Sequence, residues 1–502
     1  MISMWSLGIS VLVAFTLSSL INYVTSPLRG IPGPFLAGFT NVYRLIVVLR
    51  GNADKTHRQL HEKYGEYLRL GPNHVSISDL KMIGVIYDSK GQYRKSDFYA
   101  VADFVRGSEV VCTGFSTRDE KQHLEIVRPI AKLYTSTAVI EHEPRLDQAI
   151  DILVNAIERH ASNDTSCPLD RLVYVFATNA MTLMTFSQMF DPTGQGQNIQ
   201  SLVHKTFLAT WYLAVVGQLP SLDRWLAKNP ICYIGPPSTS TLAQLAAEIL
   251  KERQPVGSRG ALMSCPDYQP DFLDHFDRIS TDFGVKVQWM MRNVAAGSDS
   301  TAISIISLVY LLCQSSDAMD ILSNELEEQG VGQQIREGRQ VKYNLLQDAT
   351  KFPYLDAVLR ENRRLHPPVA LGMERVVPRG GFKHGDMFLP EGTIVSMNPA
   401  VVHYNPDLFG PDPNQFRPER WLPKAEEDHS TYTARIKCWD EAMLTFGRGK
   451  RRCPGNHLSD MEVRKCIVTL VARFSFDLEK GPSKHAYWFH YLKDLYVRVA
   501  VK

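Results

Sequence analysis

This sequence lacks several features that would assign a protein to a common structural or functional class. No two of its eight cysteines form a Cys-x-x-Cys pair, which argues against a zinc site or a disulfide framework and favours a reducing, cytosol-facing environment. The net charge is only +2 and no basic stripe is present, so no nucleic-acid partner is indicated. No linker, repeat or low-complexity stretch divides the 502 residues. No glycine-rich dinucleotide fingerprint or fused flavin module is evident either. The pattern indicates one large domain without a nucleotide- or flavin-binding module.

The N-terminus contains no charged residue before Arg29. Ile2 to Val24 form a run of 23 mainly apolar residues, and about 20 such residues cross a bilayer as a helix. A cleaved signal peptide is the alternative, but it requires a basic start and a small-x-small exit, and neither is evident. The cations after the run predict a cytosolic body: Arg29, Arg44, Arg50, Lys55 and Arg58. We therefore expect a transmembrane anchor over residues 1–26, a stiff proline-rich hinge over 27–34 and one domain over 35–502.

One cysteine near the C-terminus lies in a cationic setting. Cys453 stands between Gly449 and Gly455. Four cations precede it: Arg448, Lys450, Arg451 and Arg452. A thiol has a pKa of about 8.5 and needs neighbouring positive charge, freed backbone N–H groups or a helix N-terminus to be a thiolate at pH 7. A helix that starts near Pro454 would supply the last of these. The alternative is an ordinary buried core thiol, but the four cations favour a metal-bound thiolate.

A second apolar stretch, Trp289 to Cys313, resembles a membrane span in composition alone. It contains Arg292 and Asp299, which are costly in lipid. A helix that is hydrophobic all round can instead be the central helix of a large globular core, and this interpretation is the favoured one.

Small and hydroxyl residues gather in one turn of this helix, Ala296 to Thr301. Gly297 costs about 1 kcal/mol relative to alanine inside a helix, so its presence indicates that room is needed there. The Ser300 hydroxyl can bond back to a carbonyl one turn earlier and bend the helix. An opened turn beside the Asp299 carboxylate would hold dioxygen and a short water chain. The alternative is that Asp299 only pairs with a nearby lysine or arginine.

A further helix is predicted over Tyr354 to His366, where Pro367 and Pro368 stop it. It places Glu361 and Arg364 one turn apart on the same face. Such a pair on a surface contributes less than about 1 kcal/mol and would mean little by itself.

The run from Phe446 to Gly455 matches, at every fixed position, the Phe-x-x-Gly-x-Arg-x-Cys-x-Gly signature of the cytochrome P-450 superfamily, and the chain resembles that family from the hinge to about residue 470. The resemblance implies that Cys453 is the axial ligand of a heme b iron and that Phe446 belongs to the cofactor site. Ala296 to Thr301 is similar to the family's oxygen-activation motif, in which Asp299 is the acid and Ser300 replaces the usual threonine.

The same resemblance assigns two groups of cations. Glu361 and Arg364 are similar to the family's invariant pair, which Arg420 completes to a buried triad that locks the segment carrying Cys453. The heme propionates would be held by Arg451 and Arg375. A third propionate ligand is left open between His123 and Arg128, because the usual spacing of the family is not met here.

The resemblance implies a membrane-anchored monooxygenase of the endoplasmic reticulum, single-pass with its body in the cytosol. Asp299 and Ser300 would relay protons, and electrons would come from NADPH-cytochrome P-450 reductase. The docking face for the reductase would be basic: Lys121, Lys132, Arg448, Lys450 and Arg452. A reductase-independent isomerase or dehydratase and a non-enzymatic heme gas sensor are the alternatives. The retained acid–alcohol pair argues against the first, and the lack of an output domain argues against the second.

The fold that the resemblance implies is mainly α with a small β lobe, the cytochrome P-450 fold with one N-terminal transmembrane helix. The resemblance also implies substrate contacts from four regions, 93–115, 207–225, 290–295 and 369–373, whose apolar side chains predict a hydrophobic small molecule. The runs Arg375 to Gly381 and His403 to Trp421 resemble the pisatin-demethylase-type enzymes of filamentous fungi, which implies a step in secondary metabolism.

Overall fold

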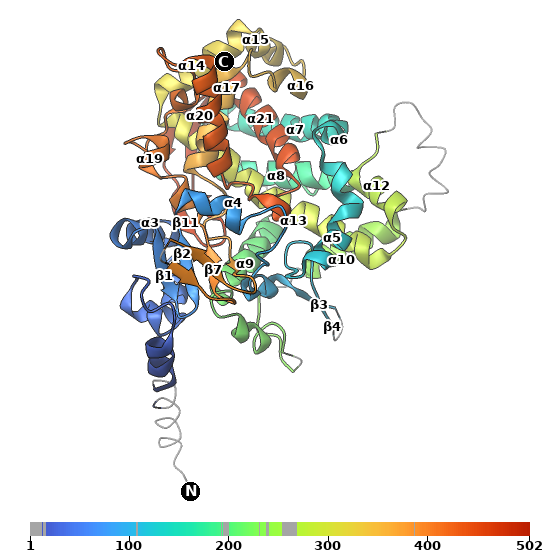
Figure 1. Cartoon of the computed structure of the whole chain (residues 1–502). Helices are drawn as coiled ribbons and strands as arrows, with labels where there is room; N and C mark the ends of the chain where they lie inside the picture. Colours follow the sequence, from blue (N-terminus) through green and yellow to red (C-terminus); the bar gives the residue numbers. More distant parts are fainter. Residues whose placement is uncertain are drawn as a thin grey trace.

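The structure is a computed structural model that describes residues 13, 17–106, 109–191, 193, 200–229, 231–236, 240–253, 269–385 and 387–502. Helices dominate it, and the strands form several small sheets, which confirms the mainly helical fold predicted from the sequence. Figure 1 shows the helices packed into one body, with β1, β2, β7 and β11 on the side where the chain begins.

The helical elements run through the whole body. In chain order the α-helices are α2 (Val42–Leu49), α3 (Ala53–Tyr64), α4 (Ile83–Ile86), α5 (Glu120–Val127), α6 (Ser136–Val139), α7 (Glu143–Ser162), α8 (Leu169–Phe186), α9 (Gln200–Val216), α10 (Ser240–Glu252), α12 (Phe272–Ile279), α13 (Phe283–Cys313), α14 (Ser316–Glu328), α15 (Val331–Arg336), α16 (Tyr343–Leu346), α17 (Pro353–Leu365), α18 (Pro399–Val402), α19 (Pro406–Phe409), α20 (His429–Ala442) and α21 (Asn456–Arg473). The 3-10 helices are η1 (Phe35–Gly38), η2 (Leu80–Met82), η3 (Asp97–Ala102), η4 (Arg128–Tyr134), η5 (Ile140–His142), η6 (Pro220–Arg224), η7 (Pro418–Trp421) and η8 (Gly449–Arg451).

The strands are β1 (Tyr67–Gly71), β2 (His74–Ile77), β3 (Phe104–Arg106), β4 (Glu109–Val111), β5 (Cys167–Pro168), β6 (Arg375–Val376), β7 (Phe382–His384), β8 (Met387–Leu389), β9 (Ile394–Ser396), β10 (Phe474–Lys480), β11 (Ser483–Ala486), β12 (His490–Lys493) and β13 (Tyr496–Val501). The largest sheet has the order β1-β2-β9-β6, in which only β2 and β9 are parallel. In this sheet Arg375, the first residue of β6, pairs with Val395 of β9. Arg375 also forms an isolated antiparallel bridge with Lys95.

Local sequence explains where the long helices begin and end. The Asp282 side chain caps α13 by accepting from the backbone N–H of Val285 at 2.9 Å, as an N-terminal cap should. Helix α17 begins with Pro353 in its first turn and ends at Leu365, because the two prolines that follow cannot continue it.

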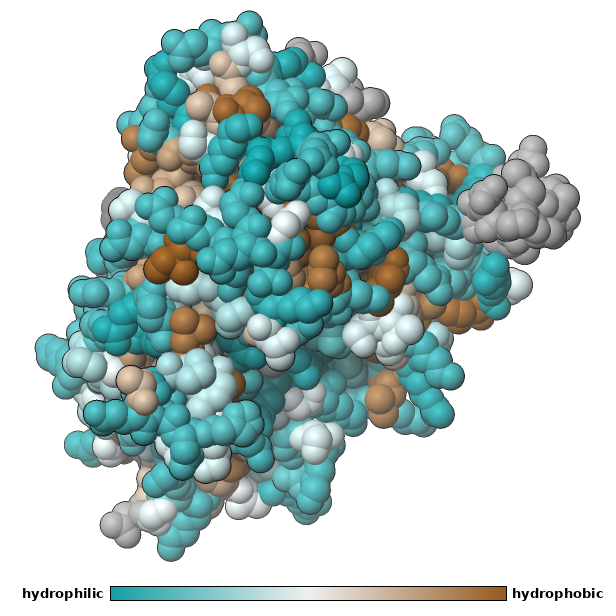
Figure 2. All heavy atoms as spheres, turned by 90° about the horizontal axis from the view of Figure 1, so that it is seen from above, coloured by the Kyte–Doolittle hydropathy of each residue, from teal (hydrophilic) through white to brown (hydrophobic). Residues whose placement is uncertain are grey.

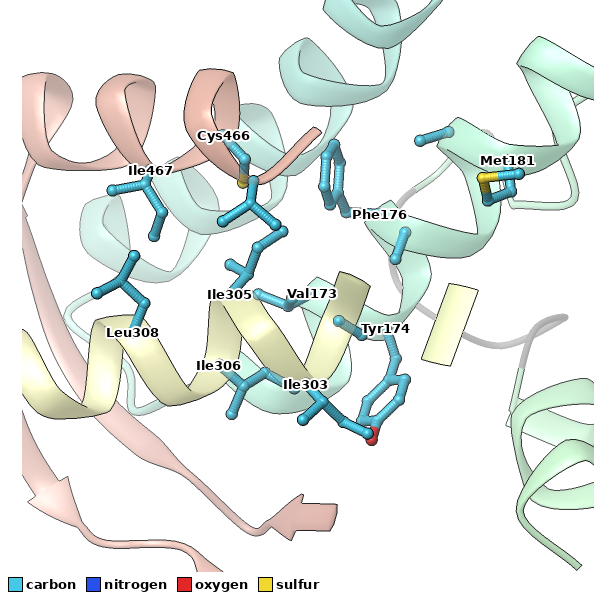
Figure 3. Packing of buried hydrophobic residues seen from close by; sticks show 14 of the residues in the cluster. Val173, Tyr174, Phe176, Met181, Ile303, Ile305, Ile306, Leu308, Cys466 and Ile467 are labelled. Carbon is cyan, nitrogen blue, oxygen red and sulfur yellow. The ribbon is translucent and has the colours of Figure 1, made fainter. Parts of the chain in front are cut away.

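The central helix is α13, and it lies in the core. Figure 3 shows Ile303, Ile305, Ile306 and Leu308 of α13 packed against side chains of α8 and α21 such as Val173 and Ile467. Within the described residues α13 is the one helix long and apolar enough to cross a membrane, but 61% of its most apolar window is buried inside the protein. The structure therefore places this stretch in the core, which is the interpretation favoured from the sequence.

The anchor predicted for residues 1–26 falls largely outside the described residues. Residues 17–25 are helical and project from the body at the dark-blue end of the chain (Figure 1). Their aliphatic side chains are about half exposed: Leu17, Leu20, Ile21 and Val24. The face of the body in Figure 2 is, by contrast, mostly hydrophilic with hydrophobic residues scattered over it, as is normal for a globular protein.

The predicted hinge, residues 27–34, is not helical and is docked on β1. The backbone N–H of Arg69 donates to the Pro32 carbonyl at 2.8 Å. A Cβ at Gly33 would lie 2.3 Å from the Arg69 carbonyl oxygen, so only glycine allows this approach. The hinge is thus fixed to the body, and the end of the preceding helix contacts it as well, since the Tyr23 ring stacks on Phe39 and lies 5.5 Å from the Arg69 guanidinium of β1.

Candidate active site

A cavity of about 320 Å³ lies between α13, the loop before α21 and the edge of the β lobe. It is lined by six of the residues that the sequence singled out: His123, Ser300, Arg375, Phe446, Arg451 and Cys453. Two others do not line it. Arg128 is exposed at the start of η4, and Asp299 is buried behind the cavity wall.

The cysteine loop presents its sulfur to this cavity. The backbone N–H of Cys453 donates to the Phe446 carbonyl at 2.8 Å and closes the loop. Gly449, with φ of +65°, passes so close to the backbone that a Cβ there would lie 2.2 Å from the Tyr87 carbonyl oxygen. The Cys453 side chain is open to the cavity and is otherwise enclosed by protein.

Burial raises the pKa of the Cys453 thiol, although the Gly455 N–H and the Arg292 and Arg452 guanidiniums act in the opposite direction. Of the four cations that the sequence predicted to favour a thiolate, Arg452 lowers the pKa of Cys453. Arg451 pairs instead with Glu120 at 2.8 Å, and Arg448 donates to the Glu441 carbonyl. A metal cation bound at the sulfur would favour the thiolate form.

Four basic side chains from four segments meet at one end of the cavity: Lys95, His123, Arg375 and Arg451. His123 lies with its Nδ1 3.0 Å from the Gly114 carbonyl oxygen. Burial, assisted by Arg451, lowers the pKa of His123 to about 4, so its ring is neutral at pH 7. Of the two residues left open as a third propionate ligand, His123 is the one that the structure brings to this end.

Lys95 is the member of this group that sequence reasoning missed. Its ammonium is fully buried, donates to the Phe115 carbonyl at 2.6 Å and lies 4.0 Å from the centre of the Tyr99 ring. Burial, then Arg375, Arg451 and Arg292, hold the pKa of Lys95 well below its ordinary value. A buried lysine surrounded by other cations is rare and requires an anion. No sequence pattern marks Lys95, because its neighbours Arg375 and Arg451 are remote in the chain.

The donor set fits heme. The sulfur of Cys453 can bind iron, and the cations of Lys95, Arg375 and Arg451 match the two propionate carboxylates that heme carries. The rest of the cavity is lined by apolar and neutral residues together with Arg292, Arg363, Arg452 and Glu462.

The turn around Ser300 forms the wall of the cavity opposite to Cys453. The Ser300 hydroxyl donates back to the Ala296 carbonyl at 2.7 Å, as predicted for a bent helix. The room predicted at Gly297 is filled by protein, since a Cβ there would lie 2.4 Å from the Met181 sulfur of α8. Glycine is therefore required at this position for close packing of α13 on α8.

Asp299 points away from the cavity. The Tyr491 hydroxyl donates to its carboxylate at 3.3 Å and the Thr206 hydroxyl does so at 3.5 Å. Burial raises the pKa of Asp299 to about 7 against these two hydrogen bonds. Among the described residues Asp299 thus accepts from two hydroxyl groups and forms no close ion pair. The alternative, in which Asp299 only pairs with a nearby lysine or arginine, is not what the structure shows.

A second buried acid, Glu462 of α21, does line the cavity. The Thr301 hydroxyl donates to its Oε2 at 3.0 Å, and its Oε1 has no partner among the described residues. Burial raises the pKa of Glu462 to about 8. The sequence analysis did not identify Glu462, because α21 also carries Asp460, Arg464 and Lys465 and its pattern does not mark one acid.

Glu361, Arg364 and Arg420 are brought together beside the cysteine loop, fully or almost fully buried. Glu361 accepts from both arginines at 2.8 Å and from the Trp421 indole at 2.9 Å. Arg364 also donates to the carbonyls of His403 and Pro413 at 2.9 and 2.7 Å. The three side chains thereby tie α17 to η7 and to the loops that precede the cysteine.

The regions expected to contact substrate contribute unequally. Lys95, Tyr99, Gly114 and Phe115 come from 93–115, Arg292 and Asn293 from 290–295, and Val369 and Met373 from 369–373. The fourth region, 207–225, does not reach the cavity within the residues described. Trp488 and Phe489, between β11 and β12, were not predicted and supply aromatic lining.

Comparison with known proteins agrees with this geometry. The family model described as Cytochrome P450 matches residues 32–487. The chain is 32% identical over 511 aligned positions to the cytochrome P450 monooxygenase pkfB of Emericella nidulans, covering 99% of this chain and 97% of the relative. It is 31% identical to the cytochrome P450 monooxygenase cfoH of Aspergillus candidus, covering 93% and 86%, and 31% identical to cicH of E. nidulans, covering 95% and 94%. Together with the cysteine loop and the cluster of cations at the cavity, these matches show that the chain belongs to the cytochrome P450 family and is a heme-thiolate monooxygenase.

Proposed function

We propose that this protein is a membrane-anchored monooxygenase of fungal secondary metabolism that oxidises a hydrophobic small molecule with dioxygen, using electrons that NADPH-cytochrome P-450 reductase delivers to heme b. The observation that carries the proposal is the pairing, across one cavity, of the Cys453 sulfur with the cations of Lys95, Arg375 and Arg451. When bound there, heme supplies the oxygen-activating redox chemistry.

The protein's own groups have separate tasks. Cys453 would bind the heme iron through its sulfur, and Lys95, Arg375, Arg451 and His123 would hold the carboxylates of the cofactor. The aromatic rings of Phe115, Trp488 and Phe489 line the substrate side and exclude water. The triad of Glu361, Arg364 and Arg420 holds the cysteine loop and takes no part in the redox chemistry.

Protons reach the oxygen site through the turn at Ser300. Asp299 can release or take up a proton near neutral pH because burial raises its pKa to about 7. The carboxyl group lies behind the turn that carries the Ser300 hydroxyl, so a relay from Asp299 to the cavity requires the helix to open or water to enter at this turn. A carboxyl with a pKa near the working pH suits a general acid.

The reductase would dock on the side of the cysteine loop. Lys121, Lys132 and Arg452 are exposed, whereas Lys450 is half-buried and lies 3.6 Å from Glu120. Exposed cations suit an acidic electron donor. The exposed aliphatic helix of residues 17–25 supports the single-pass anchor in the endoplasmic reticulum.

The test is spectroscopic and catalytic. Reduced full-length protein with carbon monoxide should give the Soret band typical of a thiolate-ligated heme, and Cys453→Ala should lose it. Product formation should require reductase and NADPH and incorporate one atom of labelled dioxygen. Turnover of a peroxide without NADPH would instead favour the isomerase or dehydratase, and gas binding without any NADPH consumption would favour a sensor.

A further inference from the structure

The central helix α13 carries a buried cationic donor that no group in the described part of the chain satisfies. Among the described residues nothing accepts from Arg292 Nη1 or from the amide nitrogen of Asn293 beside it. Both residues line the cavity, and the Asn293 amide oxygen already accepts from the Tyr134 hydroxyl. Buried donors without acceptors are costly. This stretch of α13 therefore faces a ligand that supplies acceptors.

The Arg292 guanidinium lies against Gly114. A Cβ at Gly114 would lie 2.9 Å from Arg292 Nη1, so a side chain there would displace the guanidinium. The Gly114 carbonyl oxygen lies 3.0 Å from His123 Nδ1 and accepts from Arg451 Nη1 at 3.4 Å. Arg292 thus reaches, from the central helix, the cluster of basic side chains at one end of the cavity.

Helix α5 brings no cation to this place. His123 and Val127 stand one turn apart on the same face of α5, and Val127 Cγ2 also lies 2.9 Å from the position that a Cβ at Gly114 would take. Arg128, the next residue, is exposed. The guanidinium of Arg292 and the methyl group of Val127 therefore meet at Gly114, where α13 supplies a charge that α5 does not.

Two guanidiniums at the cavity remain without a carboxylate partner. Arg451 shares its charge with Glu120 at 2.8 Å, whereas Arg292 and Arg375 line the cavity and form no ion pair within the residues that the structure describes. An arginine stays protonated in proteins, so two positive charges need anions. Heme carries two propionate carboxylates, which is one for each of these two arginines.

We propose that Arg292 binds a propionate carboxylate of heme from the central helix, an assignment that rests on the heme binding proposed above. A guanidinium presents paired donors in the geometry that a carboxylate accepts. Ser300 follows Arg292 by eight residues on α13, which corresponds to about 12 Å of helix. The helix that carries the turn at the oxygen site is thus tied to the cofactor by a second, charged contact.

The experiment measures the transfer of heme from the full-length holoenzyme, in detergent, to apomyoglobin. Arg292→Met removes the charge and should speed the transfer about tenfold, because a charge-assisted hydrogen bond is lost. Arg292→Lys should give an intermediate rate. Adding Val127→Arg to Arg292→Met brings a guanidinium to Gly114 from α5 and should return the rate to within about threefold of wild type. The control Arg128→Met changes an exposed arginine and should stay within about twofold.

Heme dimethyl ester separates a contact with the propionates from a general loss of stability. Loaded with this cofactor, wild type and Arg292→Met should lose it at the same rate, since no carboxylate is left to bind. Unchanged heme transfer in Arg292→Met, or an equally large effect with the ester, overturns the assignment. If wild type shows the thiolate-type Soret band with carbon monoxide, either result leaves the monooxygenase in place. A wild type without that band overturns the proposed function itself.

Discussion

The Thr301 hydroxyl donates to the Glu462 carboxyl at 3.0 Å, and this hydrogen bond joins the central helix α13 to α21, which follows the cysteine loop. The pair connects the two walls of the cavity in which heme would lie. Because the acid is buried and one of its oxygens has no partner among the described residues, its ionisation also makes the stability of the protein depend on pH.

The first prediction concerns this dependence. Burial raises the pKa of Glu462 from 4.5 to about 8, so between these values the unfolded chain releases a proton that the folded protein retains. The Glu462 contribution to the free energy of unfolding is therefore lost as pH rises from about 4.5 to about 8. Glu462→Gln should flatten the decline in denaturant unfolding over this range. Thr301→Val should extend the decline to higher pH, since the hydrogen bond that lowers the pKa is removed. An unchanged pH profile in both variants would contradict the assignment.

The second prediction concerns the triad. Glu361→Gln should lower the free energy of unfolding by roughly 3–5 kcal/mol, because it leaves Arg364 and Arg420 buried without their anion. Denaturant unfolding and heme retention measure the effect. The matched control is Asp440→Asn, which removes the half-exposed partner of Arg360 at 2.6 Å and should cost less than about 1 kcal/mol. Equal losses in the two variants would mean that the triad does not support the loop.

A third prediction tests the proton role of Asp299. With its pKa near 7, the protonated acid is depleted above neutrality, so turnover should decline there. Asp299→Asn should remove this pH dependence and slow turnover by roughly 10²-fold. Tyr491→Phe removes a hydrogen bond that stabilises the carboxylate and should move the midpoint to higher pH. The heme spectrum should stay normal throughout; a wild-type pH profile in Asp299→Asn would exclude the relay.

The fourth prediction concerns Lys95, which is buried among other cations. Lys95→Met should speed the transfer of heme to apomyoglobin about tenfold, since one counter-charge of the propionates is gone. The heme-free protein should become more stable, because an uncompensated charge is no longer buried. Lys95→Arg should retain heme. A heme-free Lys95→Met protein that is less stable than wild type, with normal heme retention, would show that Lys95 only fills space.

A fifth prediction addresses the anchor. Deleting residues 1–26 should move the protein from the membrane pellet to the supernatant after carbonate extraction, because the apolar run supplies the insertion energy. The hinge is bonded to β1 through Arg69 and stays, so heme binding should persist. A truncated protein that still pellets with membranes would place the membrane contact elsewhere on the body.

The order of residues along the chain determined the features that depend on neighbours in sequence. The family resemblance implied the mainly helical fold, the two prolines predicted a helix that stops at His366, within one residue of its observed end at Leu365, and the charged residues within the apolar run predicted the burial of α13. The run from Phe446 to Gly455 identified the family, because a closed loop with an exposed sulfur needs its glycines at fixed spacing.

Only the tertiary structure decided which charges meet. It joined Lys95 to Arg375 through a sheet edge, turned Asp299 away from the cavity and exposed Arg128 while bringing His123 inside. It also placed Arg292 and Asn293 at the cavity, where Arg292 Nη1 and Asn293 Nδ2 have no acceptor among the described residues. The charge state and the partners of a side chain depend on its burial and on residues that can lie hundreds of positions away in the sequence. The same side chain can therefore be neutral, ion-paired or in need of a ligand, depending on which groups pack beside it.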